Sequence, residues 1–274
     1  MMGRILAIAA IEMRIALRNR WVAIAVAMMV LFSLVLSAAG SAPTGALGTD
    51  RLSVIVASLT SLAVYLVPLV ALLMSFDAIA GEIERGTLPL LLTYPVTRTQ
   101  IVLGKAAAHL AVLAMALAAG YGVAAIAAVA TDRTALNGLP SLWRLFWSSL
   151  PLGAAFLCAG YTLSALARRP SGAAGLAIGL WLIAVVLWDL ALLAAVVADD
   201  GGRFTTSFLP AALLTNPADA FLLYNLSASQ ATAAAAGLAG AANAIPPLAA
   251  LTSVLVWPLC GLGAAVLAFR RITP

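Results

Sequence analysis

The fold of this chain is decided by one stretch, Asp77–Lys105, which has the sequence DAIAGEIERGTLPLLLTYPVTRTQIVLGK. It is the densest cluster of charged residues in an otherwise apolar chain, and contains Asp77, Glu82, Glu84, Arg85, Arg98 and Lys105. The apolar segments on either side are each long enough to cross a bilayer, which requires about 20 residues. These charges are therefore expected at a membrane surface.

The composition of the 274-residue chain is that of a membrane protein, because 64% of the residues are hydrophobic and only 9% are charged. Soluble domains carry about 25% charged residues. Six spans and their loops fill the length and leave no room for a soluble catalytic domain. The net charge of +5 comes from basic residues between the apolar segments, where topology signals belong, so nucleic acid is not an expected partner.

The apolar pattern predicts an all-α membrane protein in which residues 1–274 form a single transmembrane domain. The six expected spans cover residues 21–39, 52–76, 101–130, 142–167, 172–197 and 248–269. Three further segments complete the domain: an interface helix at 1–20, a charged element at 77–100 and a connection with short helices at 198–247. Proline, asparagine and aspartate interrupt those short helices, so neither is expected to cross the bilayer by itself.

Residues 1–20 alternate charged and apolar side chains at helical spacing, which is typical of an amphipathic helix lying on a membrane surface. Glu12, Arg14 and Arg18 are the candidate functional residues of this helix. The alternative is a plain basic flank that only fixes the orientation of the first span.

The distribution of basic residues predicts the orientation of the chain in the membrane. With the N-terminus inside, eleven of the 15 lysine and arginine residues lie on cytoplasmic segments and four on outer segments. Both termini and the element at 77–100 are therefore expected in the cytoplasm, and the connection at 198–247 is expected outside.

No enzyme or metal constellation is visible in the sequence. A P-loop, a Cys or His cluster at metal spacing and a nucleophile elbow are all absent from it. His109, Cys158 and Cys260 lie in apolar segments, where packing is their expected role. The seven methionines are scattered without M-x-x-M spacing, so they do not indicate a path for a soft metal.

Asp189 is the intramembrane polar candidate, because it lies well inside the fifth expected span. A carboxylate at the centre of a membrane helix costs about 2.5–3.5 kcal/mol on insertion scales, so such residues are functional candidates. It would be the working residue of an intramembrane carrier or enzyme. Two other interpretations remain open: a protonated group bonded to a neighbouring helix, or a residue near the outer interface.

The charged element offers a set of residues that a soluble partner could bind. Gly81–Arg85 forms about one charged helical turn, Gly86 interrupts it, and an apolar group made by Leu88, Leu90, Leu91 and Leu92 follows. Charges at the rim and leucines at the centre are typical of a docking segment. The alternative is a solvated loop whose charges only hold the topology, as in a structural membrane anchor.

This pattern resembles the permease subunits of ABC-2-type transporters, which share a type V exporter-like architecture. The residues that carry the resemblance are Glu82, Glu84, Arg85, Gly86, Thr87, Leu88, Leu91 and Leu92, followed by Pro95, Val96, Arg98 and the run Ile101–Lys105. The resemblance implies that this element couples the permease to a separate ATPase, which binds ATP and Mg²⁺. It also implies a homodimer, with no cofactor bound by this chain.

Residues 17–21, 57–69, 86–105 and 215–221 resemble, more narrowly, the permeases that serve maturation of nitrous oxide reductase. That resemblance implies a bacterial inner membrane location, a cytoplasmic ATPase, a periplasmic solenoid protein and a role in assembling a copper-sulfur centre. Asn216, Pro217 and Asp219 are then candidate contacts with the external partner. An ABC-2 exporter of lipid, drug or polysaccharide is the alternative within the family.

Overall fold

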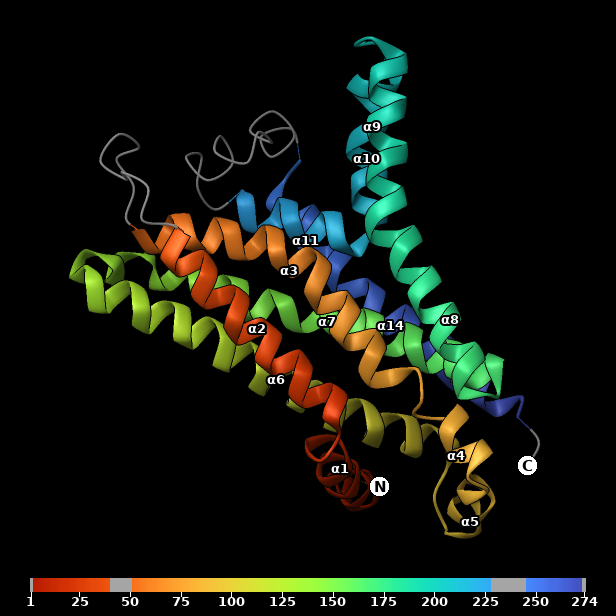
Figure 1. The fold of residues 1–274 in the computed structure, drawn as a ribbon. Helices are drawn as coiled ribbons and strands as arrows, with labels where there is room; N and C mark the ends of the chain where they lie inside the picture. The colour runs from red at the N-terminus through yellow and green to blue at the C-terminus, as the bar shows by residue number, and fades with distance from the viewer. Residues whose placement is uncertain (1, 40–50, 228–244, 273–274) are drawn as a thin grey trace.

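The computed structural model describes residues 2–39, 51–227 and 245–272, and every element in those ranges is helical (Figure 1). The predicted all-α membrane fold is therefore confirmed. Outside the described ranges lie residues 1 and 273–274, the loop expected at 40–50, and residues 228–244 of the expected external connection. Within those ranges five helices are long and apolar enough to cross a membrane, or six if the bent pair at the N-terminus counts as one span.

The helices of the first half are α1 Met2–Leu17, α2 Arg20–Ala39, α3 Arg51–Ser75, α4 Ala80–Glu84, α5 Thr87–Thr93 and α6 Arg98–Thr131. Those of the second half are η2 Arg133–Gly138, α7 Leu139–Ala167, α8 Pro170–Trp181, η3 Leu182–Leu187, α9 Trp188–Asp199, η4 Phe204–Phe208, α10 Leu209–Thr215, α11 Pro217–Leu226 and α14 Pro247–Arg270. The elements η3 and η4 are π-helical, and η2 is a 3₁₀ helix.

Helix α6 begins three residues before the span expected from hydropathy, because a capping box defines its start. Gln100 Oε1 accepts from the backbone N–H of Thr97 at 2.9 Å, and Thr97 Oγ1 accepts from the backbone N–H of Gln100 at 3.2 Å. The two bonds satisfy donors that the first helical turn leaves free. The polar ends of the long helices thus extend beyond their apolar centres.

One end of the molecule gathers α1, α4, α5 and the C-terminal end of α14 (Figure 1). Arg98, in the first turn of α6, donates to the backbone carbonyl oxygens of Phe269 and Arg270 at 2.7 and 3.1 Å. An arginine that binds the last carbonyls of a helix satisfies acceptors left free by the helical pattern. The C-terminal end of α14 is therefore fixed to the start of α6.

From the same end of the molecule, α8, η3 and α9 run as one helical rod from Pro170 to Asp199; α8 packs on α3 and α7, and α9 projects away from the bundle (Figure 1). We call this rod the arm. The chain then turns back, and α10 lies beside α9 before α11 runs along α3. The described part of the expected connection at 198–247 thus contains η4, α10 and α11.

Within the bundle, α3 and α7 are in close contact at Gly160. A Cβ atom added to Gly160 would lie 1.9 Å from Ser75 Oγ and 2.9 Å from Ser75 Cβ. The Ser75 hydroxyl is itself buried and donates to the carbonyl of Ala71 at 2.7 Å. Glycine is therefore required at position 160 for the two helices to pack.

Replacing Gly160 with alanine is expected to destabilise the fold by about 1–3 kcal/mol, because the new methyl group displaces the Ser75 hydroxyl and separates α3 from α7. The matched control is Gly175→Ala in α8, where a Cβ atom meets nothing within 4 Å. Thermal unfolding of both variants in detergent measures the difference. Equal midpoints for the two variants would contradict this packing argument.

Candidate functional site

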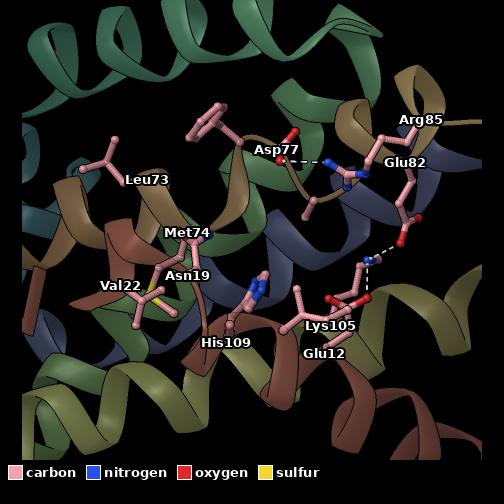
Figure 2. Close-up of a pocket in the computed structure, with 14 residues that line it drawn as sticks. Glu12, Asn19, Val22, Leu73, Met74, Asp77, Glu82, Arg85, Lys105 and His109 are labelled. Atoms are coloured by element: carbon pink, nitrogen blue, oxygen red, sulfur yellow. Dashed lines mark hydrogen bonds and ion pairs between the residues drawn. The ribbon is translucent and has the colours of Figure 1, made fainter. Parts of the chain in front are cut away.

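Three segments that are distant in sequence meet at the side chain of Lys105. This residue lies in α6, and only 3% of its side chain is exposed. Its ammonium group donates to Glu12 Oε1 of α1 at 2.5 Å and to Glu82 Oε1 of α4 at 2.7 Å (Figure 2). We call these three residues the ionic junction. It joins the predicted interface helix to the predicted coupling element through a transmembrane helix.

The ionic junction is an unbalanced arrangement, because one ammonium group faces two carboxylates. Glu82 Oε2 and the nearby Asp77 Oδ1 are both buried, and neither atom has a hydrogen-bond partner. Both residues line a cavity of about 160 Å³ between α1, α3 and α6. His109 also points into this cavity, while its Nδ1 lies 2.7 Å from the hydroxyl of Tyr161 (Figure 2). The cavity is thus a polar space at the junction of the helices.

Helix α1 reaches Lys105 because the preceding residue is a glycine. A Cβ atom on Gly104 would lie 2.6 Å from Ile8 Cγ2 and 3.2 Å from the carbonyl oxygen of Ile5. The absence of a side chain at Gly104 therefore lets the backbone of α1 lie directly on α6. The dipeptide Gly104–Lys105 supplies both the close approach and the charge that binds Glu12.

Helix α4 is fixed to the bundle at its start by a buried serine. Ser164 Oγ of α7 accepts hydrogen bonds from the backbone N–H groups of Ile79 and Ala80, at 3.0 and 2.9 Å. At its other end the helix stops at Gly86, which has φ = 67° in the left-handed region. Glycine adopts this conformation without steric cost, so the chain can reverse into α5.

The residues predicted to couple to an ATPase divide into two groups in the structure. Glu82 and Leu88 face the protein interior, and Leu88 is only 2% exposed. Leu91 and Leu92 are partly buried against the core, whereas Glu84, Arg85, Gly86 and Thr87 are exposed.

Leu90 and Tyr94 are 65% and 66% exposed. We call the outward set of Glu84, Arg85, Leu90 and Tyr94 the exposed face of α4–α5.

The remaining candidate residues lie in two places. Glu12 of α1 faces the ionic junction, whereas Arg14 of α1 and Arg18, just after α1, are exposed. The intramembrane candidate and the external candidates come together: Asp189 lies beside Asp219, and Asn216 and Pro217 are buried in the same α11 segment. Direct contact of these buried residues with a partner would require the chain to open around them.

Sequence reasoning missed the roles of Lys105 and Ser164. Lys105 did belong to the polar stretch, and a lysine one helical turn inside a long apolar helix is a signal for a buried ionic partner. Ser164 lies in an apolar helix without any distinguishing pattern. Its role depends on the position of α4, which only the structure defines.

Comparison with known families agrees with this geometry. The model of the family described as ABC-2 family transporter protein matches residues 6–272. The chain belongs to this family: it is a multi-pass membrane permease, the non-catalytic membrane subunit that works with an ATPase. The family resemblance inferred from the sequence is therefore confirmed.

Two curated relatives are similar over nearly the full length of the chain. The probable ABC transporter permease protein NosY of Pseudomonas aeruginosa is 43% identical over 95% of both chains. The protein of the same name from Stutzerimonas stutzeri is 39% identical over 98% of this chain and 99% of its own length. The similarity thus extends over nearly the whole transmembrane domain.

Replacing Lys105 with methionine is expected to destabilise the protein by about 3–5 kcal/mol, because it leaves two buried carboxylates without a cation. The triple variant Glu12→Gln, Lys105→Met, Glu82→Gln removes all the charges and should recover most of that loss. Chemical unfolding in detergent measures both, with the exposed Arg14→Met as control. A single variant as stable as the triple one would show that the junction has no structural role.

Proposed function

We propose that this chain is the permease of an ABC system that matures the copper-sulfur centre of nitrous oxide reductase. The observation that carries the proposal is the near full-length similarity to two proteins named NosY. The partners would be a NosF-like cytoplasmic ATPase, which binds ATP and Mg²⁺, and a NosD-like periplasmic protein. The permease would bind no cofactor itself, and it would act as a homodimer in the bacterial inner membrane.

In this proposal the exposed face of α4–α5 is the surface that docks on the ATPase. It combines the charges of Glu84 and Arg85 with the exposed apolar side chains of Leu90 and Tyr94, which suits a docking segment with a polar rim. The face projects from the same end of the molecule as both described ends of the chain (Figure 1). Both termini and α4–α5 are then cytoplasmic, as the distribution of basic residues predicts.

Movement of α4 would reach the rest of the molecule through two attachments. Ser164 holds the start of α4 on α7, and Lys105 holds Glu82 on α6. Near its other end, α7 binds α11, because Ser148 Oγ accepts from Asn225 Nδ2 at 2.9 Å. Rigid helices with fixed attachments at both ends transmit displacement along their length. The work of ATP hydrolysis would therefore arrive at α11.

Replacing Glu84 and Arg85 with alanine is expected to uncouple the ATPase from function while the permease stays folded in the membrane. Both side chains are exposed, so their loss should change stability by no more than about 0.5 kcal/mol. The measurement is maturation of the reductase together with ATPase activity of the complex. Arg133→Ala, exposed on η2, is the matched control. Normal maturation by the double variant would contradict the docking role of this face.

The function itself is tested by the metal content and visible spectrum of nitrous oxide reductase from a strain that lacks this gene. The enzyme should lack its copper-sulfur centre and recover it when the wild-type chain is returned. A fully assembled enzyme would overturn the maturation role and favour export of a lipid, drug or polysaccharide. Activity without any ATPase partner, lost on Asp189→Asn, would instead favour an intramembrane carrier.

A further inference from the structure

The arm meets α11 at the place where the arm ceases to be a regular α-helix. The π-helical turn η3 alters the backbone hydrogen bonds of the arm, and such turns are frequent at functional sites. Asn216 Nδ2 donates to the carbonyl oxygen of Ala184, inside η3, at 2.6 Å. Asn216 Oδ1 accepts from the backbone N–H of Ala218 at 2.9 Å and so caps α11. One side chain therefore defines the start of α11 and attaches it to the arm.

Two aspartates lie beside this attachment. Asp189 is in the first turn of α9, and Asp219 is in the first turn of α11, where it is 5% exposed. Their carboxyl groups lie close enough to share a hydrogen bond. Ionised carboxylates only accept hydrogen bonds, so this contact requires one proton between the two groups. The second oxygen of Asp219 and the indole N–H of Trp188 are also buried there, and the indole lies beside Asp219.

The electrostatic surroundings favour the protonated form of Asp219. Burial, followed by the charge of Asp189, raises the pKa of Asp219 from the ordinary value of 3.8 to about 8, although the Trp188 indole N–H acts in the opposite direction. The other titratable groups of α3, α7 and α14, which pack on α11, do not perturb it. Those whose contacts are known lie elsewhere: Arg144 binds the Tyr224 carbonyl, Tyr161 binds His109, and Arg270 approaches Thr99. The described residues of η4 and α10 carry no titratable side chain.

We propose that Asp189 and Asp219 form a proton-binding site that holds the arm against α11. With one proton on the pair, Asp219 donates to Asp189 and closes the contact. Without that proton, two carboxylates face each other, and their repulsion opposes the Asn216–Ala184 attachment. The ligand of the site is thus a proton, and its effect is to couple the position of the arm to the position of α11.

The surroundings suit a proton better than a metal ion. In the described part of the chain no group of three or more His, Cys, Asp or Glu side chains could hold a metal. Hard cations such as Ca²⁺ require six or more oxygen ligands. Here two carboxyl groups adjoin an indole N–H, which is a donor and cannot act as a ligand.

Infrared spectroscopy of the full-length protein in lipid nanodiscs tests the site directly, through the C=O stretch of a protonated carboxylic acid. The wild type should lose such a band as pH rises through about 8, the pKa of Asp219. The band should be missing in Asp219→Asn. In Asp189→Asn its midpoint should fall, because the like charge is gone and the new amide donates to Asp219. The control is Asp200→Asn, at the exposed end of the same arm, which should titrate as the wild type does.

Thermal unfolding between pH 5 and pH 9 measures the effect on the contact. The pKa of Asp219 is higher in the folded protein than its ordinary value, so its contribution to stability is complete below 3.8 and is lost as pH rises through about 8. The wild-type midpoint should therefore fall across this range. Asp219→Asn keeps a hydrogen-bond donor at every pH, so it should not show this component.

Three results would overturn the proposal. The first is a wild-type protein without a carboxylic acid band that titrates near neutral pH. The second is a band that persists unchanged in Asp219→Asn, which would assign it to another residue. The third is a thermal midpoint that follows the concentration of sodium or potassium ions rather than pH, which would identify a cation in place of the proton.

Discussion

The rest of the structure at the α4–α5 end depends on the burial of Lys105. An ammonium group removed from water costs several kcal/mol unless carboxylates surround it closely. Here the two carboxylates come from α1, which lies along α6, and from α4, which is only five residues long. Because separating either carboxylate leaves a buried charge unpaired, α1, α4 and α6 move most easily as one unit. The ionic junction therefore joins α1 and α4 to α6 as a single rigid platform.

That platform determines what the protein can present to a partner. Glu82 and Leu88 point inward and fix the orientation of α4 and α5, while Gly86 reverses the chain between them. Glu84 and Arg85, next to these anchors in sequence, are consequently displayed outward on a rigid base. A docking surface built in this way transmits force instead of bending, because the buried side chains of Glu82 and Leu88 hold it in place. Arg98 extends the same platform to the end of α14.

Much of this architecture could be predicted from the sequence, because hydropathy and charge report on a local environment. The long helices and the position of the polar stretch follow from single segments, and Glu84 and Arg85 of the exposed face belong to the motif that carries the family resemblance. The ionic junction could not be predicted, because Lys105 and Glu12 are 93 residues apart and their meeting depends on how α1 folds back. Glu82 and Glu84 look equivalent in sequence, yet helical geometry turns one inward and the other outward. Asp189 and Asp219 were both recognised, but their contact depends on the π-helical turn.

The two charged sites are held together by different interactions, so one is rigid and the other can switch between two arrangements. At the ionic junction opposite charges attract, so the site has one favoured arrangement and serves as a rigid attachment. At the Asp189–Asp219 pair, like groups are held together by a proton, so the site has two arrangements that differ by a single ionisation. Helix α7 joins the two, since Ser164 contacts α4 and Ser148 contacts α11. Coupling between distant sites requires an element with two states that both sites can bias. In this chain the acid pair supplies the two states, and the rigid platform transmits displacement through α7 to α11, which carries one member of that pair.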